Sequence, residues 1–349
     1  MDFTTYINQN QQQGILPGLV LGYQYGYDAP VIAAYGLDGA QQPLSADSVF
    51  PVASITKLAL SLAVLKLIDR EEIALDDSIG TYLSDITPAS APLTIRSLLC
   101  HTSGLALDLA DKDGLYAVGL DWAKLAKECL NTPPINPAWS GVQYSNLGYG
   151  LLGILLERMT GQSCADALSS LVLTPLGIRG LLGNPTDLTV ATVADVRGRH
   201  RGTNLETFNS PFWRSLALPW GGLCTDAAGA LALVDAFLPT SDFLSPALRE
   251  IAVRDHTQGL SGGFMPPLWW HPSPWGLGPE VRGTKAPHWV SPQFAPTSFG
   301  HSGASGMFVW ADESSMIRIV MLGARVADSG WMIRHGPQIT SLVINQLTQ

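Results

Sequence analysis

Hydrophobic and polar positions form three different patterns in the first part of the chain. Residues 2–12 are mostly polar and predict a short helix. Residues 18–25 and 31–35 are rich in aliphatic and aromatic side chains and predict two strands joined by a turn that contains Gly and Pro. Residues 58–65 form an apolar run, which predicts a helix.

The middle and the end of the chain carry different signals. Little strand signal occurs between residues 76 and 180, and residues 181–212 are polar and irregular. Residues 257–298 are loop-rich, with four tryptophans among eight prolines. Helices are expected at 93–99, 110–131, 144–161, 164–172, 226–237 and 337–347, and strands at 303–310 and 316–323.

This order of elements predicts an α+β fold. Strands at both chain ends would meet in one antiparallel sheet with flanking helices, formed by residues 1–75 and 205–349. Residues 76–204 would form an inserted all-helical domain. Pockets form preferentially between domains, so we expect the active site in the cleft between them.

Composition narrows the class of protein. The 349 residues are 46% hydrophobic and 14% charged, which indicates a well-packed globular protein. The net charge of −9 has no clustered basic counterweight, which argues against a nucleic-acid partner. An acidic, polar N-terminus does not resemble a signal peptide, and no apolar stretch reaches about 18 residues. We therefore expect a cytoplasmic protein with no membrane partner; its oligomeric state is not predicted.

The four cysteines show neither paired nor metal-ligand spacing. We expect buried thiols and no metal site. These residues are Cys100, Cys129, Cys164 and Cys224.

Ser54 and Lys57 are the first candidates for chemistry. Lys57 is the first basic residue in the chain, and it opens the apolar run three residues after Ser54. On a helix the two side chains would be neighbours, about 5–6 Å apart at Cβ. A buried lysine with a lowered pKa can take the proton of a serine nucleophile. The alternative is a helix N-cap at Ser54 followed by a solvated Lys57.

Tyr144 and Asn146 stand two residues apart just before a predicted helix. From a loop both could point the same way, the phenol relaying a proton and the amide orienting a base. The alternative is that Ser145 or Asn146 only caps the helix.

His301 lies in a stretch of small residues near the C-terminus, from Phe299 to Phe308. Small residues let a substrate lie against a strand whose N–H groups stabilise an oxyanion, and His301 is expected to face the same cleft. Two alternatives are a structural histidine and a nucleophile elbow with Ser302 as nucleophile. The elbow requires a helix after the serine and a second glycine where Ala304 stands.

The order Ser-x-x-Lys, Tyr-x-Asn, His-x-Gly resembles the serine β-lactamase and penicillin-binding-protein superfamily, in its class C and family VIII carboxylesterase branch. Three further stretches are similar to pieces of that family, at 98–105, 221–225 and 275–278. The resemblance covers most of the chain and implies a β-lactamase-like fold.

The resemblance also implies roles. Ser54 would be acylated, Lys57 and Tyr144 would share its proton, and Asn146 would hold Lys57 or the substrate. The family leaves open whether Lys57 or Tyr144 is the formal base. The backbone N–H groups of Ser54 and Ala304, next to Gly303, would form the oxyanion hole. No metal or cofactor is implied, and His101 and the glycines at 104, 221 and 222 are interpreted as structural.

One departure from the family pattern suggests the substrate. Lys-Thr-Gly is usual where this chain has His301-Ser302-Gly303. A histidine with an ordinary pKa of about 6.5 is largely neutral at pH 7 and lacks the fixed cation that holds a substrate carboxylate. We therefore expect a serine carboxylesterase for neutral short-chain esters, with Trp269 and Trp270 in an apolar wall of the cleft.

Two other functions stay open. The first is an amide hydrolase, such as a β-lactamase, a D-aminopeptidase or an oligoamide hydrolase. The second is a pseudoenzyme that uses the cleft only to bind a ligand or partner. The complete set of Ser54, Lys57 and Tyr144 argues against the second.

Overall fold

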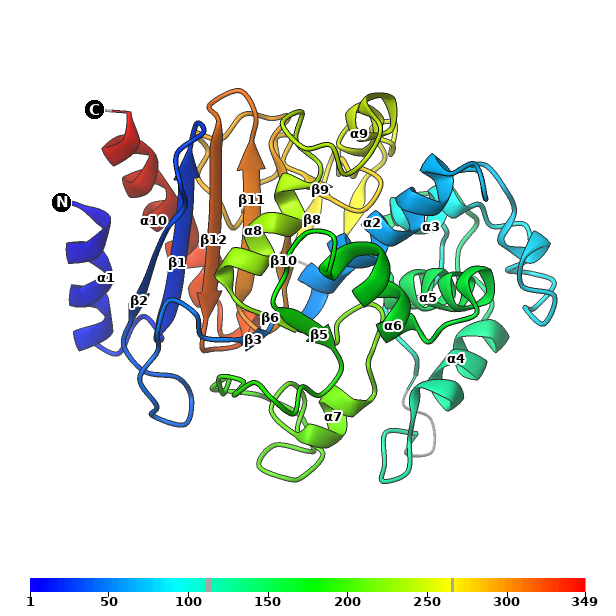
Figure 1. The fold of residues 1–349 in the computed structure, drawn as a ribbon, viewed down its shortest axis with the longest axis horizontal. Coiled ribbons are helices and arrows are strands. Elements are labelled where there is room, and N and C mark those ends of the chain that lie inside the picture. The colour runs from blue at the N-terminus through cyan, green and yellow to red at the C-terminus, as the bar shows by residue number, and fades with distance from the viewer. Residues whose placement is uncertain (111–114, 265–266, 349) are drawn as a thin grey trace.

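A six-stranded antiparallel sheet joins the two ends of the chain (Figure 1). The structure is a computed structural model, which describes residues 1–110, 115–264 and 267–348. β1 pairs with β12, so the N- and C-terminal strands lie side by side and the predicted α+β fold is confirmed. The sheet order is β2 (Val31–Tyr35), β1 (Leu19–Tyr25), β12 (Ile317–Gly323), β11 (Met307–Asp312), β10 (Phe299–Gly303) and β9 (Glu280–Val281).

Alternation of side chains along the strands produces two hydrophobic layers. Leu19 and Leu21 of β1 pack with α1 (Phe3–Gln12) and α10 (Trp331–Leu347), which cover one face of the sheet. Val20 points to the opposite face, which α8 (Ala227–Asp235) covers. Successive residues of a strand point to opposite faces, so a strand buried on both faces is apolar throughout.

Helices from the middle of the chain pack beside the sheet. α2 (Thr56–Asp69) is buried on every side of its first ten residues, and it packs on α5 (Asn146–Thr160). Ser145 caps α5 by accepting a hydrogen bond from the Gly148 N–H, 3.1 Å away. The remaining helices are α3 (Ile95–Leu99), α4 (Trp122–Asn131), α6 (Cys164–Leu168) with a π-helical turn (Ser169–Leu173), α7 (Pro211–Ser215) and α9 (Pro246–Ala252).

Three predicted elements need correction. The strand expected at 303–310 is a hairpin, with β10 and β11 on either side of a turn at 304–306. The last helix begins at Trp331 rather than at Pro337, because burial of Trp331 and Met332 in the core compensates for the hydrogen bond that proline cannot make. The helix expected at 110–131 is formed only from Trp122 to Asn131: residues 115–121 are turns and irregular backbone, and residues 111–114 lie outside the described ranges.

The short strands were not predicted, because two or three residues are too few to show the alternation of apolar and polar side chains that indicates a strand. They form two small sheets: β3 (Phe50–Pro51), β6 (Leu223–Thr225) and β5 (Gly180–Leu182), and then β4 (Val142–Gln143), β7 (Gly262–Gly263) and β8 (Trp269–Trp270). Isolated bridges also join Val190 to Val49 and Ala194 to Arg325. The domain boundaries at 75 and 204 stay a prediction. Within the described ranges, no helix has both the length and the apolarity needed to cross a membrane.

Candidate active site

Ser54 lies in a tight turn between β3 and α2. A short 3₁₀ turn (Ala53–Ile55) carries it, and Ala53 has φ 47°. A non-glycine residue in this left-handed region is strained by about 1–3 kcal/mol, and such strain is typical of functional sites. Lys57 follows in the first turn of α2, with Nζ 3.2 Å from Ser54 Oγ.

Lys57 is fully buried, which excludes the interpretation of a solvated residue. Its Nζ lies 2.7 Å from Asn146 Oδ1 and 2.9 Å from the Trp220 carbonyl oxygen. Burial lowers the pKa of Lys57 well below its ordinary value, and Asp108 offsets this in part. A neutral amine has two N–H groups and one lone pair. Asn146 and Trp220 accept the two hydrogens, so the lone pair is left to face the Ser54 hydroxyl.

Tyr144 directly precedes Ser145, the N-cap of α5, and its ring packs against the same site. Lys57 Nζ lies 4.7 Å from the centroid of its ring, which also packs on His101 and Phe264. Burial raises the pKa of Tyr144 well above its ordinary value, and the nearby Ser54 hydroxyl counters this only in part. Its own hydroxyl completes no hydrogen bond with any described residue. A buried phenol in this state holds its proton and can donate it.

Asp108 is a site residue that sequence reasoning missed. The Asn146 Nδ2 group donates to Asp108 Oδ2 at 3.3 Å, while Asn146 Oδ1 accepts from Lys57. The carboxylate therefore determines which end of the amide faces Lys57. Asp108 lies in a loop and has no regular spacing to Ser54 or Asn146, so the sequence held no signal for it.

β10 approaches the Ser54 turn closely because residue 303 is glycine. A Cβ at Gly303 would lie 2.4 Å from the Val52 carbonyl oxygen. Gly303 and Ala304 line the cavity beside Ser54. The oxyanion hole formed by the N–H groups of Ser54 and Ala304 stays a prediction.

His301 does not face the cleft, contrary to expectation. Its side chain is fully buried and lines neither cavity beside Ser54. Nδ1–H donates to the Ser302 carbonyl oxygen at 2.7 Å, and burial lowers the pKa of His301 to about 3. The imidazole is therefore neutral at any ordinary pH. Ser302 sits in a β-hairpin with no helix after it, which rules out the nucleophile elbow.

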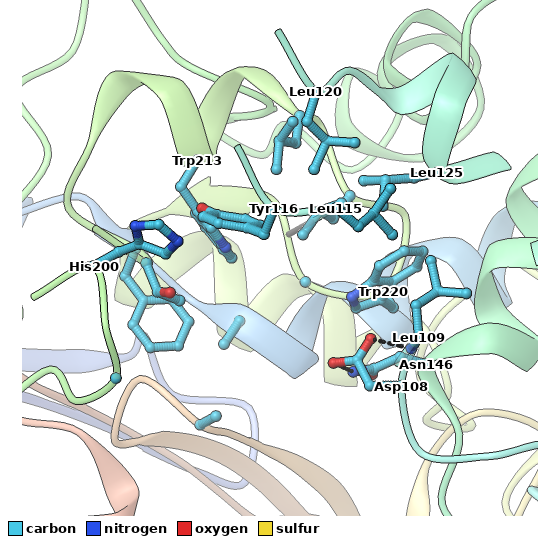
Figure 2. A pocket seen from close by; sticks show the side chains of 18 of the residues that line it. Asp108, Leu109, Leu115, Tyr116, Leu120, Leu125, Asn146, His200, Trp213 and Trp220 are labelled. Carbon is cyan, nitrogen blue, oxygen red and sulfur yellow. Dashed lines mark hydrogen bonds between the residues drawn. The ribbon is translucent and has the colours of Figure 1, made fainter. Parts of the chain in front are cut away.

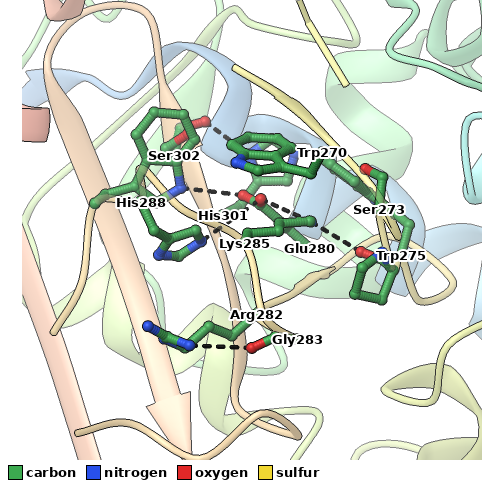
Figure 3. A network of polar contacts seen from close by, with 12 residues as sticks. Trp270, Ser273, Trp275, Glu280, Arg282, Gly283, Lys285, His288, His301 and Ser302 are labelled. Atoms are coloured by element: carbon green, nitrogen blue, oxygen red, sulfur yellow. Dashed lines mark hydrogen bonds and ion pairs between the residues drawn. The ribbon is translucent and has the colours of Figure 1, made fainter. Parts of the chain in front are cut away.

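A buried ion pair supports the strand that carries His301 (Figure 3). Lys285 Nζ lies 2.8 Å from Glu280 Oε1, and both side chains are inaccessible to solvent. The Trp289 indole donates to Glu280 Oε2 at 3.1 Å. Burial alone would raise the pKa of Glu280, but Lys285 and His288 outweigh it and lower that pKa. Because Glu280 pairs with Gly300 in the sheet, the charges anchor the 280–290 segment to β10.

Two cavities of about 430 and 570 Å³ open beside Ser54, and both also contact Asp108, Asn146 and Ala304. Figure 2 shows the first, whose wall is largely apolar and includes Trp213 and Trp220. The segment 197–220, which sequence reasoning treated mostly as irregular, supplies much of this wall. In the described part of the chain, no group of three or more His, Cys, Asp or Glu side chains is arranged to hold a metal ion.

The prediction that Trp269 and Trp270 form a wall of the cleft is wrong. Trp269 is 55% exposed and lines a different pocket, and Trp270 is buried with its indole N–H bound to the Pro287 carbonyl oxygen. Trp289 does line the second cavity, beside Phe264. Residues 265 and 266 of this segment lie outside the described ranges.

His101 and the cysteines have surroundings that explain their burial. His101 Nδ1 accepts a hydrogen bond from the Ser145 N–H at 3.1 Å, and its ring packs 4.4 Å from that of Tyr144. All four cysteines are free and buried, as expected.

The beta-lactamase family model matches residues 3–330, so the chain belongs to this family of serine hydrolases. It is 37% identical to Esterase EstB of Burkholderia gladioli over 156 residues, 40% of each chain. It is 28% identical to Penicillin-binding protein 4 of Amycolatopsis lactamdurans over 306 residues, which cover 83% of this chain and 75% of that protein. The chain thus spans less than half of the length of EstB.

The fold has solved counterparts. The structure of EstCE1, described as a hydrolase with promiscuous acyltransferase activity, matches with a TM-score of 0.79 at 21% identity, over 98% of this chain and 97% of that chain. The family expected from the three motifs is confirmed, and the β-lactamase-like fold with it.

Proposed function

We propose that the protein is a serine carboxylesterase that acts through an acyl-enzyme on short-chain esters without a carboxylate. The observation that carries the proposal is the environment of Lys57. Its Nζ has two hydrogen-bond acceptors, Asn146 Oδ1 and the Trp220 carbonyl oxygen, and its third neighbour is the hydroxyl group of Ser54. This arrangement fits a neutral amine that accepts the Ser54 proton.

In the proposed mechanism, the Lys57 amine takes the proton of Ser54 while Oγ attacks the ester carbonyl. The N–H groups of Ser54 and Ala304 stabilise the oxyanion. Tyr144 donates its proton to the departing alkoxide and regains one from Lys57, so the alcohol leaves and the acyl-enzyme remains. A water molecule then repeats the sequence and releases the acid.

The opposite pKa shifts support Lys57 as the base. Burial favours the uncharged form of both groups, which is the free amine for Lys57 and the phenol for Tyr144. A phenol that holds its proton serves as donor or relay rather than as base.

Esters are favoured over carboxylate-bearing lactams because position 301 offers no cation. His301 is buried and neutral, and EstB is an esterase with 37% identity to part of this chain. Amide hydrolysis is the second candidate, and the similarity to Penicillin-binding protein 4 supports it.

The test combines labelling with substrate comparison. A fluorophosphonate probe should label the unaltered protein and Ser302→Ala, and should not label Ser54→Ala. p-Nitrophenyl acetate and butyrate should be hydrolysed faster than nitrocefin or D-amino acid anilides. Labelling of Ser54→Ala would refute the nucleophile, faster nitrocefin turnover would favour amide hydrolysis, and a protein that neither labels nor turns over would be a pseudoenzyme.

A further inference from the structure

Asp108 holds a carboxylate at the junction of the two cavities beside Ser54. The carboxylate accepts hydrogen bonds from the Leu109 N–H at 3.0 Å and from Asn146 Nδ2 at 3.3 Å. A carboxylate offers about four acceptor positions, so part of its capacity is open to the cavity. The side chain can be reached from the cavity, although the surrounding protein removes much of the water around its carboxylate.

No described cation pairs with this carboxylate. Lys57 makes no hydrogen bond or ion pair with it: the hydrogen-bond link runs through the amide of Asn146, and the direct influence of the carboxylate is a longer-range attraction. Arg197 lines both cavities, but its Nε lies 3.4 Å from Asp328 Oδ2. His200 lies across the pocket from Asp108 (Figure 2). Its Nε2 accepts a hydrogen bond from Arg199 Nε at 2.9 Å. The described arginines that line the cavities are thus engaged with other partners, and Asp108 is an acidic side chain shared by both cavities.

The surroundings of Asp108 favour the binding of a cation. Desolvation raises the pKa of its carboxyl group, which means that its charge is incompletely compensated. A ligand ammonium would supply that compensation. Beyond the carboxylate the wall is apolar, with Leu115, Leu120, Leu125, Trp213 and Trp220 (Figure 2). This wall suits an aliphatic or aromatic side chain.

We propose that Asp108 forms a cation subsite, which selects substrates whose acyl group carries a primary ammonium close to the scissile carbonyl together with an apolar side chain. Amino-acid esters, and the corresponding amides, have this chemistry. The inference rests on the proposed function and refines it. Neutral short-chain esters are turned over, and their ammonium-bearing counterparts are turned over better.

The experiment compares leucine ethyl ester with ethyl 4-methylpentanoate, which has hydrogen in place of the ammonium. Both leucine enantiomers are assayed by pH-stat at pH 7, with Ser54→Ala as the blank. A partly exposed ion contact predicts that kcat/KM for the better enantiomer exceeds that for the neutral ester by about two- to fivefold. Asp108→Asn should bring this ratio close to one.

Asp28→Asn is the matched control, because it removes one negative charge from the exposed β1–β2 turn, outside both cavities. It should keep the ratio of the unaltered protein. The ratio also cancels any effect of Asp108→Asn on Lys57 that is common to both esters. Equal use of the two esters, or a ratio unchanged in Asp108→Asn, would overturn the subsite.

A binding measurement keeps the inference separate from catalysis. In calorimetry at pH 7, 3-methylbutylammonium should bind the unaltered protein about two- to fivefold more tightly than 3-methylbutanol, and Asp108→Asn should lose this difference. Such binding without turnover of any ester would refute the proposed function and retain the subsite. Equal binding of amine and alcohol would refute the subsite even if esters are hydrolysed.

Discussion

Lys57, Tyr144 and His301 are all buried, and burial opposes the charged form of each. It lowers the pKa of Lys57 and His301 and raises that of Tyr144. Lys57 Nζ lies 3.2 Å from Ser54 Oγ, where it can accept the proton of that hydroxyl. Proton transfer in the site therefore depends on Lys57 and Tyr144, while His301 stays neutral and takes no part in it.

Lys57 and Tyr144 should act on one proton. Lys57→Ala, Tyr144→Phe and the double variant should each lower kcat/KM by a similar factor, on the order of 10³ or more, because groups that act as a unit are not additive. Steady-state kinetics on p-nitrophenyl butyrate provide the measurement. Multiplication of the two single effects in the double variant would show that the groups serve separate steps.

The pH profile should report Lys57 and not His301. A base works deprotonated, so kcat/KM should rise with pH through the lowered pKa of Lys57. His301→Asn should leave this acid limb in place, since His301 with a pKa of about 3 does not titrate there. Asp108→Asn removes an attraction that raises the pKa of Lys57 and should move the limb to lower pH. A limb that disappears in His301→Asn would assign the titration to the histidine.

Among the secondary-structure elements, the contact between β10 and the Ser54 turn positions the reacting groups. The strained Ala53 and the close approach of Gly303 to Val52 both belong to this contact. The β10–β11 hairpin continues into the central sheet, so the oxyanion side of the site rests on rigid structure.

A single methyl group should disturb this contact. Gly303→Ala places a Cβ 2.4 Å from a backbone oxygen, which forces the strand away from the turn. Because misplacement by about 1 Å can cost 10²-fold in rate, we expect kcat/KM to fall by roughly 10- to 100-fold.

Gly148→Ala is the control for that variant, since its added methyl meets its nearest neighbour at an ordinary 3.6 Å. It should retain most of the activity, and circular dichroism should show both variants folded. Full activity of Gly303→Ala would mean that the strand is not needed at this distance.

Across the whole molecule, the sheet holds together segments that are far apart in sequence. β1 is flanked by β2 and β12, and the buried pair of Glu280 and Lys285 ties the loop-rich segment to the sheet edge. A buried charge that loses its partner costs much more than an exposed one.

Lys285→Met should therefore lower the free energy of unfolding by about 3–5 kcal/mol, because Glu280 stays charged and buried. Adding Glu280→Gln should recover part of the loss. Lys124→Met is the matched control, since Lys124 is 60% exposed in a pair with Asp121, and it should cost less than about 1 kcal/mol. Urea unfolding measures all three. Equal costs for the two lysine variants would show that the buried pair does not stabilise the fold.

Local patterns in the chain were sufficient for the terminal strands, most helices and the placing of Lys57 three residues after Ser54. Each depends on neighbours within a few residues, and periodicity and helical spacing record such neighbours directly. The three motifs together also identified the family. The hairpin at 304–306 and the start of α10 at Trp331 were missed, because there the packing against the sheet overrides local preference.

Tertiary structure alone decided the environment of the site. Asp108 reaches Lys57 through Asn146, and the wall residues Trp213 and Trp220 come from a segment without regular pattern. The pKa of His301 depends on burial by side chains from several distant segments. Burial and proton affinity are properties of the packed neighbours of a residue, and those neighbours are brought together only when the chain folds.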